Sequence, residues 1–112
     1  MGVKTYWYNN LYVGEIASRR KRKIIRNIKK HKNQLGVYVI TLPRNSDNLL
    51  DIYPSVILNQ RYYVNRRIDV VGICGSRDEA FSVITEIVMD CYNNYGNTNL
   101  ADMFNEKGFS KG

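Results

Sequence analysis

The chain has 112 residues, which is too short for two independent cores and excludes a two-domain protein. Of these residues 44% are hydrophobic, as in an ordinary globular protein, which excludes a fully disordered chain. The net charge of +7 is concentrated in one place, because nine of the 17 Lys and Arg residues lie in residues 18–32 and the other eight are outnumbered by ten Asp and Glu residues. With two cysteines, one histidine and no apolar run near the roughly 20 residues of a membrane span, we expect a cytoplasmic protein with no membrane span, metal or cofactor.

The first predicted elements are a strand and a long helix. Residues 5–14 (TYWYNNLYVG) are aromatic and β-prone, which favours a strand or an extended arm, with a hairpin that turns at Asn9 and Asn10 as the alternative. Residues 15–32 have a helical period, and Gly36 is placed to end this helix in a left-handed conformation. The predicted inward stripe of the helix consists of Ala17, Ile24, Ile28, His31 and Leu35.

Two β-branched runs predict strands that are buried on both faces. These are residues 37–42 (VYVITL) and residues 68–73 (IDVVGI). Between them, residues 48–51 predict a turn, followed by a helix that has Pro54 in its first turn.

The clearest predicted helix covers residues 77–94. Ser76 and Glu79 have the spacing of a capping box at its start. Apolar residues recur at helical spacing along it, and Gly96 is placed to end it.

The order of these elements predicts a small α/β fold. Strands that alternate with helices indicate a (β)αβαβα domain over residues 1–96, with two or three mainly parallel strands packed by helices. Residues 97–112 are expected to form a polar C-terminal tail. Because so small a sheet exposes its edges, we also expect a homodimer.

The basic segment is the strongest functional signal in the sequence. No acidic residue occurs between Glu15 and Asp47, so the Lys and Arg side chains of the predicted helix form a ridge of like charges opposite its apolar stripe. Such a ridge lacks the Glu–Lys pairs that stabilise an ordinary solvated helix by roughly 0.2–0.5 kcal/mol each, which favours an external anion over a merely solvated face. The candidate nucleic-acid-binding residues are Arg19, Arg22, Lys23, Arg26, Lys29 and Lys30.

Nucleic acid phosphates are the favoured partner of this ridge. A row of cations along a phosphate backbone releases counterions, and it gives affinity with little base readout. The nine tyrosines and Trp7 supply possible stacking faces for bases. An acidic protein is the alternative partner, and a membrane surface is disfavoured because the apolar stripe is needed for the core.

A second candidate site is the turn after the strand of residues 68–73. Gly72, Gly75, Ser76 and Arg77 lead into a helix start, whose free N–H groups could hold a phosphate. The glycine spacing matches neither the dinucleotide nor the P-loop motif. Cys74 beside the same helix start could be a nucleophile, but Ala80 stands where the phosphatase spacing requires an arginine, so we assign no catalytic residue.

The chain also resembles a family of short proteins from Gram-positive gut bacteria. The residues that carry the resemblance are Trp-Tyr-x-Asn-Leu-Tyr-Val-Gly at 7–14, Leu-Leu-Asp-Ile at 49–52, Pro54-Ser55 and Val-Val-Gly-Ile at 70–73, so it covers most of residues 7–92. No activity or ligand is known for that family, so the resemblance implies no functional residue.

The sequence therefore favours a non-enzymatic binding or regulatory module whose basic helix contacts nucleic acid phosphates. The second interpretation is a self-associating module that grips an acidic protein partner. The third is a small enzyme that binds a phosphorylated ligand at residues 72–76.

Overall fold

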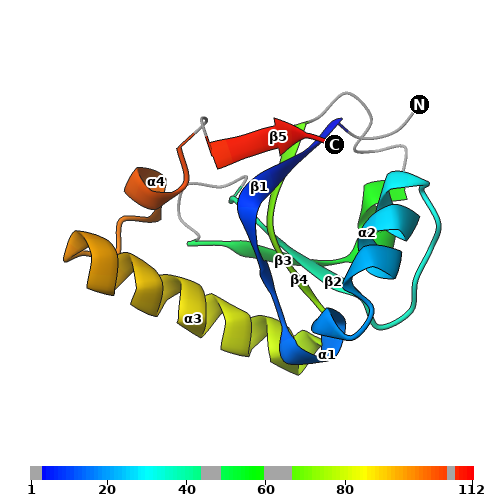
Figure 1. Cartoon of the computed structure of the whole chain (residues 1–112), viewed down its shortest axis with the longest axis horizontal. Helices are drawn as coiled ribbons and strands as arrows, with labels where there is room; N and C mark the ends of the chain where they lie inside the picture. Colours follow the sequence, from blue (N-terminus) through cyan, green and yellow to red (C-terminus); the bar gives the residue numbers. More distant parts are fainter. Residues whose placement is uncertain (1–3, 44–48, 60–66, 106–107) are drawn as a thin grey trace.

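A central sheet separates two groups of helices in the computed structural model (Figure 1). The structure describes residues 4–43, 49–59, 67–105 and 108–112. The strands are β1 (Lys4–Val13), β2 (Tyr38–Thr41), β3 (Asp51–Pro54), β4 (Arg67–Cys74) and β5 (Phe109–Lys111). The helices are α1 (Glu15–Ser18), α2 (Lys21–Lys29), η1 (Ser55–Asn59), α3 (Arg77–Tyr95) and α4 (Leu100–Met103).

Among the described residues the sheet has five strands in the order β3-β2-β4-β1-β5. Of the four pairings between them, β1 with β4 is parallel and the other three are antiparallel. The α/β class is confirmed, whereas the prediction of two or three mainly parallel strands in a (β)αβαβα order is wrong. The extra strands are short edge strands: β3 pairs with β2, the strand before it in the chain, and β5 pairs with β1, about 100 residues earlier.

Strand β3 lies where the sequence predicted a turn and the start of a helix. It pairs with β2, with Asp51 opposite Thr41 and Pro54 opposite Tyr38. Pro54 is tolerated because it ends an edge strand, where its missing N–H breaks no ladder. A 3-10 helix, η1, follows directly after β3. Residue 48, where the predicted turn begins, and the part of the predicted helix after residue 59 lie outside the described residues.

Each face of the sheet has its own core. Helices α2 and η1 cover one face, and α3 with α4 covers the other (Figure 1). The first core is built around Trp7, Ala17, Ile24, Ile28, Val39, Leu58, Val70 and Ile73. The second is built around Ile40, Val71, Cys74, Ala80, Val83, Ile87, Cys91, Leu100, Met103 and Phe104. Strands β2 and β4 supply residues to both cores, which confirms that they are buried on both faces.

Helix α3 matches the sequence prediction closely. The Ser76 hydroxyl accepts a hydrogen bond from the Glu79 N–H at 3.0 Å, and Gly96 ends the helix with φ of 74°. Residues 97–112, predicted as a polar tail, contain α4 and β5. Leu100 is buried against α3, and Phe109 pairs with Tyr8 of β1.

The basic segment does not form the single helix predicted over residues 15–32. It divides into α1 and α2, because Arg20 has non-helical angles (φ −135°, ψ 28°). The bend allows Ala17 of α1 and Ile24 of α2 to pack into the same core, each about 1% exposed.

Helix α2 also ends earlier than predicted. The His31 N–H donates to the Ile28 carbonyl and the Lys32 N–H donates to the Asn27 carbonyl, which together form a Schellman motif. His31 takes the left-handed position of this motif, with φ of 58°. His31 is exposed and Leu35 is fully exposed, so the prediction that both lie on the inward stripe is wrong.

Candidate anion-binding surface

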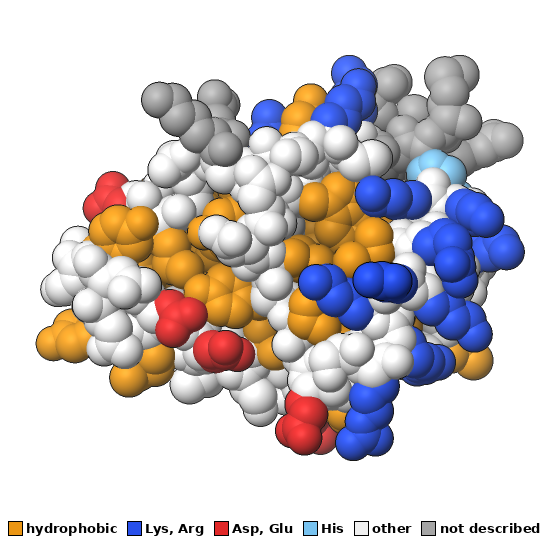
Figure 2. Space-filling view, viewed as in Figure 1, with side chains coloured by type: hydrophobic (Ala, Val, Ile, Leu, Met, Phe, Trp, Pro, Cys, Tyr) orange, Lys and Arg blue, Asp and Glu red, His pale blue; other side chains and the backbone are white. Residues whose placement is uncertain are grey.

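The Lys and Arg residues between Arg19 and Lys32 form one exposed surface, called here the basic surface. Figure 2 shows these side chains gathered over α2 on the right of the molecule. The folded helix explains their exposure, because Ile24 and Ile28 turn toward the sheet and direct the other sides of α2 to solvent.

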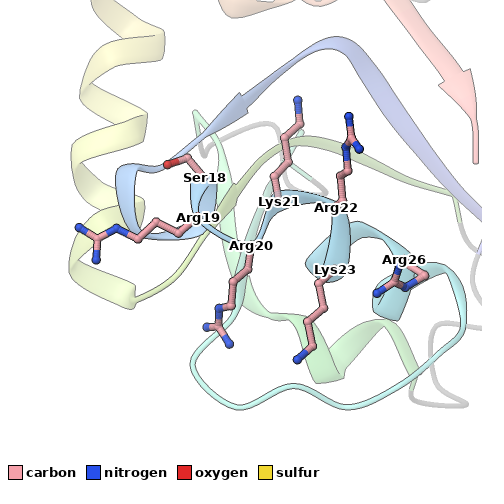
Figure 3. A pocket seen from close by; sticks show the side chains of 7 residues that line it. All are labelled: Ser18, Arg19, Arg20, Lys21, Arg22, Lys23 and Arg26. Atoms are coloured by element: carbon pink, nitrogen blue, oxygen red, sulfur yellow. The ribbon is translucent and has the colours of Figure 1, made fainter.

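The bend between α1 and α2 creates an open hollow of about 590 Å³ within the basic surface (Figure 3). Arg20 and Lys23 extend to one side of the bend, and Lys21 and Arg22 extend to the other. The side chains that line it are Ser18, Arg19, Arg20, Lys21, Arg22, Lys23 and Arg26. The hollow is therefore bordered by six cations from only eight consecutive residues, some on each side of the bend.

Four of the six predicted binding residues line this hollow, namely Arg19, Arg22, Lys23 and Arg26. Lys29 and Lys30 are exposed on the same surface but do not line the hollow. Sequence reasoning missed Arg20 and Lys21, because a continuous helix would place them beside the apolar stripe. The bend at Arg20 changes their direction, and this run of Lys and Arg residues contains no residue type that would predict the position of the bend.

Apart from Arg19, which interacts electrostatically with the Glu79 carboxylate, the charges of the basic surface are not neutralised by the described part of the chain. None of these Lys and Arg residues forms an ion pair with a described carboxylate. The ion pair that the described residues do form joins Arg67 to Asp69 at 2.7 Å, on β4. The repulsion within α2 therefore has no internal compensation among these residues.

The aromatic side chains near the basic surface offer little free stacking area. Trp7 is only 8% exposed, and the Lys29 ammonium lies 5.9 Å from the centre of its ring. Tyr6, the residue before Trp7 in β1, has the Arg67 guanidinium 3.8 Å from its ring centre. The contact with Lys29 and the burial of Trp7 leave little of its ring for base stacking.

Glu79 connects α3 to the start of the basic segment. Its carboxylate accepts hydrogen bonds from the N–H groups of Ile16 (2.6 Å), Ala17 (3.2 Å) and Gly75 (2.8 Å). Partial burial raises the pKa of Glu79, but the three N–H donors and the nearby Arg19 outweigh it and bring the pKa below its ordinary value. Glu79 therefore fixes the orientation of α1, and with it the bend.

An acidic hollow lies on the other side of α1. It has a volume of about 560 Å³ and is lined by residues of α1 and α3 that include Glu15, Asp78, Glu79 and Glu86. A polyanion is repelled here and attracted only to the side of α1 that faces α2.

The second predicted site, Gly72 with Gly75, Ser76 and Arg77, is divided between two elements. Gly72 is buried inside β4, while Gly75 and Ser76 form the turn before α3 and Arg77 begins the helix. The Gly75 N–H is bound by Glu79, and the Ser76 hydroxyl caps α3. An external phosphate in this turn would have to displace the Glu79 carboxylate.

Cys74 lacks the properties of a nucleophile in this fold. It is 0% exposed, and burial together with the Glu79 charge raises the pKa of its thiol to about 12. Its proximity to the start of α3 therefore does not produce a thiolate at neutral pH. Cys91 is likewise a free, buried thiol.

Within the part of the chain that the structure describes, no group of three or more His, Cys, Asp or Glu residues could hold a metal ion. None of the described helices is both long and apolar enough to cross a membrane.

Comparisons with known proteins give no family for the chain. No family model, curated protein or solved structure matches it. The geometry of the basic surface is therefore the main indication of what this chain binds.

Proposed function

We propose that this protein is a non-enzymatic binding module that contacts nucleic acid phosphates through the basic surface. The observation that carries the proposal is the set of exposed cations around the α1–α2 bend, which have no ion-pair partner among the described carboxylates. Cations fixed in this way release counterions from a phosphate backbone, and that release supplies sequence-independent affinity.

The geometry favours backbone contact over base readout. Helix α2 has nine residues, so it is only about 13 Å long and reaches a few consecutive phosphates rather than a full groove. Trp7, which lies beside Lys29 of α2, is only 8% exposed, so phosphates rather than stacked bases are the main group that this surface can reach. We therefore expect little sequence preference.

Heparin retention followed by a duplex DNA titration tests the proposal. Arg22, Lys23 and Arg26 all line the hollow and are exposed, so changing the three together to Glu should preserve the fold and abolish retention at moderate salt. The matched control changes Lys4, Arg77 and Lys111 to Glu, which alters the net charge equally at exposed positions outside the basic surface.

The control separates a specific surface from net charge alone. Retention should be lost in the first variant and largely kept in the control. Equal loss in both variants, or retention of the first variant, would contradict the proposal.

An acidic protein partner would use the same cations and is the second candidate. A pull-down with the wild-type protein distinguishes the two partners, because nuclease treatment should release a nucleic acid complex and leave a protein complex intact. A third candidate, a phosphorylated small ligand at Gly75 and Ser76, requires displacement of Glu79. It would be supported by chemical-shift changes at those two amides upon addition of inorganic phosphate.

A further inference from the structure

Helix α3 has a second apolar stripe that its own core does not use. Phe81 is 53% exposed, Tyr92 is 56% exposed and Tyr95 is 49% exposed. With Ile84 and Val88, which are half-buried, these side chains lie within an arc of about 80° on the helix. The arc contains no charged residue between Phe81 and Tyr95. It lies beside the face of α3 that carries Ala80, Ile87 and Cys91 into the core.

The spacing of this stripe is self-complementary. In an antiparallel pairing of two α3 helices centred on Val88, Phe81 lies opposite Tyr95 of the second copy, and Ile84 lies opposite Tyr92. Each pair combines residues equally far from the centre, which is the requirement of a two-fold axis. The steps between positions 81, 84, 88 and 95 are three, four and seven residues. Helices that pack along a seam place their contact residues at this alternating spacing of three and four, which sums to seven.

We propose that the outer stripe of α3 binds a second copy of this chain as an antiparallel helix pair. The exposed halves of Phe81, Tyr92 and Tyr95 provide roughly 300 Å² of apolar surface, since an aromatic side chain has about 200 Å² in total. This is less than half of the roughly 800 Å² per partner that a standard-size interface buries, so we expect a weak dimer that forms only at high protein concentration.

The charges around the stripe favour a second copy over an anionic occupant. The stripe carries no carboxylate, and the one cation on its line is Arg77, one turn before Phe81 at the start of α3. One cation does not make the row of positive charges by which a protein binds anionic lipid or a phosphate backbone. In the antiparallel pair, Glu86 and Asp90 each lie about 160° from Val88, so neither enters the seam, and the Asp90 carboxylate keeps its hydrogen bond from the Tyr12 hydroxyl.

The pairing leaves the basic surface free. Helices α2 and α3 pack on opposite faces of the sheet (Figure 1), so contact through α3 buries no residue of the α1–α2 hollow. The dimer therefore presents two basic surfaces, which gives avidity on a long polyanion if the proposed function is correct. The dimer itself does not depend on that function.

Light scattering over a dilution series tests the association. The wild-type protein should show twice the 13.0 kDa mass of one chain at high concentration. The variant with Phe81→Glu and Tyr92→Glu should show a single-chain mass and keep its fold, because both side chains are largely exposed in one copy. A single-chain mass for the wild type at every concentration, or a dimer that persists in the variant, overturns the proposal.

Cross-linking tests the axis. Val88→Cys places a thiol at the proposed two-fold axis, where a short bis-maleimide reagent should join two copies, whereas Cys74 and Cys91 are buried and should not react. The matched control is Glu86→Cys, which lies about 160° around the same helix and should not cross-link. Phe81→Cys should link to Tyr95→Cys in a mixture but not to itself, since the two Phe81 positions are about 20 Å apart. Cross-linking of Glu86→Cys, or of Phe81→Cys to itself, overturns the antiparallel pairing.

Discussion

Removing the Glu79 carboxylate should destabilise the fold and loosen the basic surface together. The Glu79→Ala variant removes the acceptor for the N–H groups of Ile16, Ala17 and Gly75. Water can replace the carboxylate readily at Ile16, which is exposed, and less well at Ala17, which is 1% exposed. A buried N–H without a partner costs about 1–3 kcal/mol, and the two more accessible bonds add a smaller amount, so we expect a loss of about 2–3 kcal/mol.

Urea denaturation measures this loss. Glu86→Ala is the matched control, because Glu86 lies on the same helix and lines the same acidic hollow without accepting any of these bonds. It should change the free energy of unfolding by less than about 0.5 kcal/mol. Near-equal stability of Glu79→Ala and Glu86→Ala would refute the role assigned to Glu79.

The pH dependence provides an independent check on the same group. The pKa of Glu79 is lowered in the folded protein, so the ionised form stabilises the fold at pH values above the ordinary pKa of 4.5. That stabilisation is lost as the pH falls through the lowered folded-state pKa. The difference in stability between wild type and Glu79→Gln should therefore be constant near neutral pH and shrink below about pH 4.5. A difference that grows as the pH falls would refute the reasoning.

Three further predictions follow from the site and its supports. His31→Gly should stabilise the protein by about 1 kcal/mol, measured by thermal unfolding, because His31 holds a left-handed conformation that glycine adopts without strain. A destabilised variant would contradict this. Cys74 and Cys91 should react with Ellman's reagent only as fast as the protein unfolds, since both are 0% exposed; rapid labelling of the native state would show an open core. Contact of the hollow with about five phosphates predicts that log K for duplex DNA falls with log salt with a slope of about −4.5, and a slope near zero would exclude phosphate binding.

Sequence signals were sufficient where an element is specified by its own residues. The β-branched runs that became β2 and β4 are apolar enough to be buried on both faces, and the structure buries them so. The start and end of α3 were readable from Ser76 and Gly96, because a cap acts through neighbouring backbone groups.

Short edge strands, whose hydrogen bonds come from a partner strand, could not be predicted in the same way. Strand β3 is four residues long and exists because β2 provides its partners. Strand β5 has three residues and pairs with Tyr6, Trp7 and Tyr8, about 100 residues earlier. Neither segment has enough apolar or β-branched residues to indicate a strand by itself.

The amino-acid order alone shows that nine cations lie within fifteen residues and that Ile24 and Ile28 anchor them to a core, because charge and helical period are local properties. The arrangement of those cations in space depends on contacts made after folding. Glu79, more than 60 residues away, holds α1 at an angle to α2, and the bend moves Arg20 and Lys21 into the hollow. The physical reason is that a carboxylate binds whichever free N–H groups the fold brings within reach, and the sequence order does not specify which these are.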